Sequence, residues 1–310
     1  MTTVTTPTSA AGAAPAHRSL ITEPRPASQA AWAAFAGLLQ RDLTVLRKNL
    51  GEFVIRTLVQ PFLLVFVFLY VFPTIGQGVG ASPTAGLHGA ALAAALRGES
   101  AFASILVPGV IGISIMFQGI QAVAMQLSQE FGYTREIEDR VQAPCPVWLV
   151  AVTKVISGAI QGVIAAAIVF PIAAVIHAKG VHANLDFHWL ILATMIPPAC
   201  VAFSALGLLL GTKFEPRNLG LMFGFIVLPI TFLGGTYYSW TKLRPVHLGG
   251  FHWLQTLVLV NPLIYVNEGL RAAVTGLPHM HLYVVYPALI GACAIFLFLG
   301  IKGFRKRVLA

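Results

Sequence analysis

Long apolar runs alternate with short polar segments from residue 53 to the end of the chain. A helix needs about 20 apolar residues to cross a bilayer. Six runs reach that length, at about 53–73, 102–127, 147–176, 189–210, 219–239 and 283–301. Because a helix satisfies its own backbone hydrogen bonds in lipid, the pattern predicts an all-α polytopic membrane protein with six transmembrane helices.

A seventh apolar stretch lies between the fifth and sixth runs, within 240–275. About sixteen residues, 251–266, precede its first charge, and Asn261-Pro262 interrupts them. Such a segment is short for a crossing and suits backbone that is buried in protein. We therefore expect a re-entrant extracellular helical hairpin before the last span.

The N-terminal region has two parts. Residues 1–30 are rich in Ala, Thr, Pro and Ser, which predicts a disordered cytoplasmic tail. Residues 31–51 have the periodicity of an amphipathic helix that lies along the membrane surface. Its apolar side would hold Trp32, Phe35, Leu39, Leu43 and Leu46. The permease domain would then occupy 53–307.

Composition and charge agree with a membrane class. Apolar residues make up 57% of the chain and charged residues only 10%, whereas soluble domains carry about 25% charged residues. The net charge is +9, but the basic residues flank the spans, so no nucleic-acid partner is expected. Six spans with both termini inside put thirteen Lys and Arg in cytoplasmic segments and five outside. This positive-inside bias predicts a multi-pass cell-membrane protein with both ends in the cytoplasm.

Three pairs of glycines four residues apart predict close helix packing: Gly158 and Gly162, Gly207 and Gly211, and Gly220 and Gly224. No motif indicates catalysis. The phosphate-binding G-x-x-x-x-G-K-[ST], H-E-x-x-H, paired C-x-x-C and G-x-S-x-G are all absent from the sequence. The histidines near the outer loops lack Cys or carboxylate partners at ligand spacing. We expect no catalytic residue, cofactor or metal in this chain.

The loop after the second span is the most highly charged part of the chain. Its segment 130–142 holds Glu130, Arg135, Glu136, Glu138, Asp139 and Arg140. A short charged helix there, stopped by Pro144 and Pro146, would give a soluble partner a surface to bind. An ordinary solvated loop is the alternative.

Three blocks give the chain its resemblance to a family. They are 106–146, which includes this loop, 228–239 with Leu-Pro-Ile-Thr-Phe-Leu-Gly-Gly, and 260–271 with Val-Asn-Pro-Leu-Ile-Tyr. In order and spacing they resemble the permease subunit of type-2 ATP-binding cassette (ABC) exporters, a group that includes daunorubicin-resistance and nodulation-factor export permeases. The resemblance covers about residues 31–307.

That resemblance implies a division of labour between subunits. Segment 130–142 would be the coupling helix that docks on a separate ATPase subunit, and the charged residues named above would contact it. ATP and Mg would be bound by that subunit, so this chain would be a permease without a nucleotide site. A second permease copy or a paralogue would complete the dimer. The cargo would be a hydrophobic or amphipathic drug, lipid or glycoconjugate, with antibiotic resistance as one outcome of export.

Polar residues inside the spans are candidates for the translocation path or its gate. Ser114, Gln118 and Gln121 share one face of the second span, where interhelical hydrogen bonding is the alternative role. Glu268 and Arg271 are three residues apart and can pair as a brace for an outer gate. An ion-coupled secondary transporter remains the alternative function, and Glu268 is its only plausible buried acid. A membrane-embedded transferase would need a metal-binding acidic or histidine cluster that the sequence does not show.

Overall fold

The computed structural model describes residues 27–75, 88–132, 146–176, 183, 185–246 and 250–308. Within these ranges the protein is helical and contains no β-strand. Its long helices are α1 (Ala27–Lys48), α2 (Leu50–Val65), α4 (Ala90–Gly132), α6 (Val147–Val175), α7 (Trp189–Lys213) and α12 (Leu282–Val308). The shorter α-helices are α3 (Phe72–Thr74), α8 (Leu219–Met222), α9 (Leu228–Leu233), α10 (Trp253–Leu257) and α11 (Pro262–Val274).

Six helical segments of the described chain are long and apolar enough to span a membrane, as predicted. They are Leu50–Thr74, Ala94–Gly132, Val147–Ile172, Trp189–Lys213, Pro216–Leu233 and Leu282–Val308. The first and fifth contain π-helical stretches, η1 (Phe66–Val71) and η3 (Phe223–Val227). The fifth ends at Leu233 and not at 239, because Gly234 leaves helical geometry and Gly235 has a φ of +70°.

The centre of the bundle is built by α4 and α7, which pack closely along their lengths. A Cβ atom on Gly207 would lie 2.9 Å from the carbonyl oxygen of Ile120, and one on Gly211 would lie 2.9 Å from the Cα of Ala124. The predicted glycine contact is therefore confirmed in α7. Gly158 of α6 likewise faces Ser204 of α7. By contrast, a Cβ atom added to Gly220 or Gly224 would meet no described atom of another helix within 4 Å.

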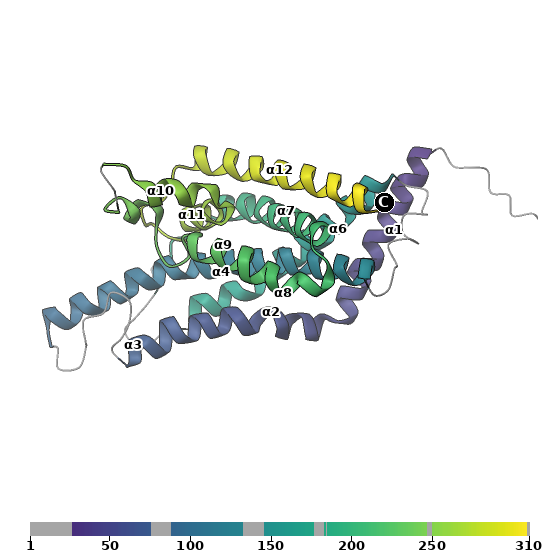
Figure 1. Ribbon diagram of the computed structural model, residues 1–310. Helices are drawn as coiled ribbons and strands as arrows, with labels where there is room; N and C mark the ends of the chain where they lie inside the picture. The colour runs from purple at the N-terminus through teal and green to yellow at the C-terminus, as the bar shows by residue number, and fades with distance from the viewer. Residues whose placement is uncertain are drawn as a thin grey trace, which may run out of the picture.

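The two ends of the bundle differ (Figure 1). Helix α1 crosses one end at a steep angle, and the C-terminus lies beside it. The short helices α10 and α11 lie at the opposite end, where the first residues of α4 project beyond their neighbours.

A sharp bend separates Trp253–Val260 from Pro262–Val274, with 95° between the two helices. The sequence break at Asn261-Pro262 causes it: Asn261 has extended backbone, and its Oδ1 accepts a hydrogen bond from Leu263 N at 2.9 Å. Asparagine at this position caps the new helix, and proline is favoured in its first turn. By length and composition the bent pair is either a re-entrant loop or a broken seventh span.

Candidate functional site

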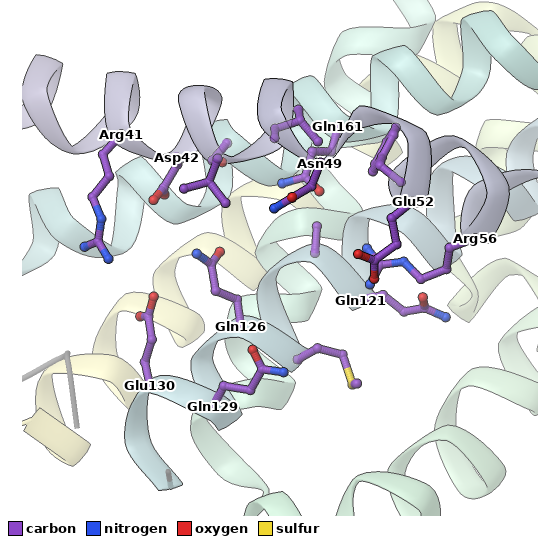
Figure 2. A pocket seen from close by; sticks show the side chains of 16 residues that line it. Arg41, Asp42, Asn49, Glu52, Arg56, Gln121, Gln126, Gln129, Glu130 and Gln161 are labelled. Atoms are coloured by element: carbon purple, nitrogen blue, oxygen red, sulfur yellow. The ribbon is translucent and has the colours of Figure 1, made fainter. Parts of the chain in front are cut away.

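A polar cavity of about 440 Å³ lies between α1 and α2 on one side and α4 and α6 on the other. Figure 2 shows side chains from these helices converging on it. Its charged and amide-bearing lining residues are Arg41, Asp42, Asn49, Glu52, Arg56, Gln121, Gln126, Gln129, Glu130 and Gln161. Lipid tails do not solvate such groups, so this cavity is a place for water, polar ligand groups or another protein surface.

A smaller cavity of about 30 Å³ continues the first one between α2 and α4. The two share Arg56 and Gln121 in their linings. The smaller cavity also contains Ser114 and Gln118, so the structure brings all three predicted polar residues of α4 to one cleft. We call the two cavities together the polar cleft.

Gln118 of α4 connects α2 and α6 across this cleft. Its Oε1 accepts a hydrogen bond from Thr57 Oγ1 of α2 at 3.2 Å, and its Nε2 donates to Gln161 Oε1 of α6 at 3.3 Å. The side chain of Ser114 donates instead to the carbonyl oxygen of Val110, one turn earlier in α4. The polar face thus makes the interhelical hydrogen bonds that were considered from the sequence, and it also lines a cleft.

Carboxamide side chains are concentrated in the polar cleft. The chain contains sixteen Asn and Gln residues. Seven of them line the cleft: Asn49, Gln60, Gln118, Gln121, Gln126, Gln129 and Gln161. Each amide offers both hydrogen-bond donors and acceptors without a net charge. Only Gln118 and Gln121 were predicted. Gln126 and Gln129 lie further along the same helix and were missed, while the residues contributed by α1, α2 and α6 cannot be predicted from the periodicity of one helix.

A buried ion cluster borders the polar cleft. Lys154 Nζ lies 2.7 Å from Glu130 Oε1 and 3.5 Å from Asp42 Oδ2. The side chains of Lys154, Glu130 and Asp42 are 1%, 5% and 5% exposed. They come from α6, the end of α4 and α1, and Figure 2 shows Asp42 and Glu130 extending toward each other. The sequence alone does not predict this cluster, because its members are far apart in the chain.

A second buried ion pair joins Glu268 and Arg271 of α11, both of which are fully buried. Glu268 also accepts hydrogen bonds from the backbone N–H groups of Trp240 and Met280, each at 2.8 Å. Arg271 donates to the carbonyl oxygen of Gly235 at 3.1 Å. The pair therefore fastens the segment after α9 and the segment before α12 to α11. Neither residue lines the polar cleft.

Asn267 extends this attachment to α4. Its Nδ2 donates to Gly234 O at 2.7 Å and to Thr236 Oγ1 at 3.2 Å. Its Oδ1 lies against Gly112 of α4, where an added Cβ would overlap it. Helix α11 is thus held in the bundle by polar contacts as well as by apolar packing.

Comparison with known proteins identifies the family. The family model described as "ABC-2 type transporter" matches residues 33–275.

The chain belongs to the ABC-2 type transporter family. It is 27% identical over 240 residues to the inner membrane transport permease YadH of Escherichia coli strain K12. The aligned region covers 76% of this chain and 82% of YadH. The proteins of the same name from Escherichia coli O157:H7 and Shigella flexneri match to the same extent.

Membership in the ABC-2 family makes this chain a transport permease and implies an ABC ATPase partner. Of the residues predicted to contact that partner, Glu130 lies in α4 and forms an ion pair with Lys154. The other five predicted contacts lie outside the described residues: Arg135, Glu136, Glu138, Asp139 and Arg140. Among the described residues no group of three or more His, Cys, Asp or Glu is placed to hold a metal ion.

Proposed function

We propose that this chain is the transmembrane subunit of an ATP-driven exporter, worked by a separate ATPase subunit and paired with a second permease copy or paralogue. The polar cleft would form part of the path taken by the cargo. The observation that carries the proposal is the polar cleft itself, which runs along helices that otherwise have the composition of membrane spans.

The cleft side of α2 supports this role. Glu52, Arg56 and Gln60 follow one another at four-residue intervals and are all exposed in the single chain. Residues at that spacing share one face of a helix. Charged side chains in a spanning helix are costly to expose to lipid, so this face would adjoin water or protein. A path between two permease subunits provides both.

The arrangement of the bundle supports access for an ATPase. Described basic residues of the predicted cytoplasmic segments lie at the end that carries α1 and the C-terminus. Arg307 of α12 donates there to carbonyl oxygens of the last turn of α7, and Arg217 follows that turn in the chain. The charged segment 130–142 begins in the last turn of α4 at that end. We assign this end to the cytoplasm and the segment to coupling, with Arg135, Glu136, Glu138, Asp139 and Arg140 as the contacts.

At the other end, we propose that the bent pair is a re-entrant hairpin and not a seventh span. Its second helix, α11, is buried almost throughout and carries Glu268 and Arg271. A seventh crossing would place α12's basic end on the outer side, against the positive-inside rule. The hairpin would brace the outer side of the path.

The cleft also bears on the cargo. Its amides and two arginines suit a polar head group, while the family resemblance favours a drug, lipid or glycoconjugate. We therefore propose an amphipathic cargo whose polar part enters the cleft. Ion-coupled secondary transport receives less support, because the three buried carboxylates of the described chain, Asp42, Glu130 and Glu268, are each ion-paired with a buried Lys or Arg. A proton-coupled carrier needs an acid that exchanges its proton during transport.

Reconstitution tests the function. The chain should co-purify with a cassette ATPase, and proteoliposomes containing both should move cargo only with ATP and Mg. Transport by the purified chain alone on a proton gradient would overturn the assignment.

Substitution of the proposed contacts tests the coupling segment. The combined Glu136→Ala, Glu138→Ala and Asp139→Ala variant should lose ATPase binding or ATP-driven transport. Asp186→Ala is the matched control, since it removes an exposed acid at the opposite end of the bundle. Equal transport by the triple variant and this control would refute the role of the segment.

A further inference from the structure

Helix α1 is attached to the bundle in an unusual way. Its apolar side does not face the core: Phe35, Leu39 and Leu43 line a shallow surface hollow, and Trp32 is 67% exposed. Among the described side chains of α1, Asp42 is the only buried one. A helix with its apolar side outward suits the lipid interface. Leu38 packs half-buried against an apolar cluster of the bundle, but the main buried polar contact of α1 is made by Asp42.

The contact at Asp42 depends on Lys154. A buried charge is strongly unfavourable unless a partner compensates it. Lys154 of α6 provides that partner for Asp42 of α1 and at the same time for Glu130 of α4. The three side chains tie three helices together at one point.

The position of Glu130 connects this ion cluster to the end of α4. Glu130 lies two residues before the end of α4 at Gly132, where the chain enters the loop toward α6. Asp42 and Glu130 also line the wall of the polar cleft. Movement of the end of α4 would therefore act on α1 and on the cleft through this ion cluster.

We propose that Asp42, Lys154 and Glu130 form an ionic latch that makes α1 move as one body with the ends of α4 and α6. The three are positioning residues, and Glu130 serves as an internal anchor in place of a contact with the ATPase. The mechanical part of this inference rests on the structure alone. The transmission of ATP-driven movement to α1 rests on the proposed function.

The latch is tested first in the permease alone. Spin labels would be attached at Gln40→Cys in α1 and Trp148→Cys in α6, both exposed positions, after replacement of Cys145, Cys200 and Cys293. The wild-type latch should give one narrow distance distribution between the labels. Asp42→Asn removes the ion pair to α1 but keeps the Lys154–Glu130 pair, so the protein should fold and the distribution should broaden.

Arg217→Met is the matched control, because it removes the Arg217–Glu215 ion pair, which is exposed and lies at the same end of the bundle. It should leave the distribution narrow. An Asp42→Asn distribution as narrow as that of the control would overturn the latch.

The second measurement uses the complex with the ATPase. Asp42→Asn should lower the amount of cargo moved per ATP hydrolysed by roughly tenfold, the size of a typical coupling between sites. Lys154→Met should lower it at least as far, and Lys154→Arg, which keeps the charge, should restore part of it. An unchanged ratio in Asp42→Asn would overturn the coupling role of the latch. A broader distance distribution in the permease alone supports the latch whether or not an ATPase binds. Failure of any ATPase to bind the wild-type chain would refute the proposed function and leave the latch standing.

Discussion

The fully buried charges of α11 are satisfied by many partners. Glu268 accepts hydrogen bonds from two backbone N–H groups in addition to its pairing with Arg271. Arg271 donates to the carbonyl oxygens of Gly235 and Tyr238. Because these bonds connect three segments of the chain, the pair is better suited to hold together the end of the bundle opposite α1 than to exchange partners with a cargo.

Removing one charge from this pair should be costly. Arg271→Met leaves Glu268 buried without its cation, and we expect the free energy of unfolding to fall by about 3–5 kcal/mol. The double variant Glu268→Gln with Arg271→Met should recover part of that loss, because it leaves no unpaired charge. Thermal unfolding in detergent measures both. The exposed Arg217→Met is the control, and an Arg271→Met protein as stable as this control would contradict the brace.

Hydropathy predicts the elements of this fold well, but it does not predict how they pair. The six spans follow from run length, since the bilayer imposes it, and the break at Asn261-Pro262 follows from local backbone chemistry. The pairing of Lys154 with Asp42 is different. It joins residues 112 positions apart, and nothing near Lys154 in the sequence distinguishes it from a lysine at the membrane surface.

The orientation of α1 illustrates the same limit. Its amphipathic pattern predicted a surface helix, and the helix is present, shifted to Ala27–Lys48. The pattern could not show that the side carrying Asp42 faces the bundle, because that depends on the cation supplied by α6. In the polar cleft, likewise, the α4 residues were predictable and their partner Gln161 was not.

A side chain of α12 caps the end of α7. Arg307 of α12 donates through Nη1 to the carbonyl oxygens of Gly211, Thr212 and Phe214 at 3.0–3.2 Å. These carbonyls end a helix and have no partners within it. Arg307→Ala should weaken the last turn of α7 by roughly 1–2 kcal/mol, since it removes hydrogen bonds from a charged donor. Amide hydrogen exchange there should become faster.

The neighbouring Lys306→Ala is the control for this variant, because its side chain is exposed and no hydrogen bond to α7 is found for it in the described structure. Exchange rates in α7 that are the same for the two variants would show that Arg307 does not cap the helix.

At the scale of the whole molecule, α1 and the C-terminus share one end of the bundle. The sequence predicts that this end is cytoplasmic, because most Lys and Arg of the connecting segments lie on that side. The assignment matters because a cytoplasmic ATPase can reach only that end.

Single cysteines at the two ends test this orientation in a cysteine-free background. Arg244→Cys, on the exposed segment after α9, should react with a membrane-impermeant maleimide in intact cells. Arg217→Cys, between α7 and α8, should react only after the cell membrane is permeabilised. Labelling of Arg217→Cys in intact cells would place α1 outside and would exclude an ATPase from that end.

The length of α4 has a practical consequence. Its 43 residues extend about 65 Å at 1.5 Å per residue, roughly twice the thickness of the hydrocarbon layer. With its last turn at the cytoplasmic surface, the first turns would stand clear of the lipid on the other face of the membrane. An epitope tag inserted in these first turns should therefore bind antibodies on spheroplasts without disturbing the packed core. The antibody signal would then measure the amount of correctly inserted protein in each cell.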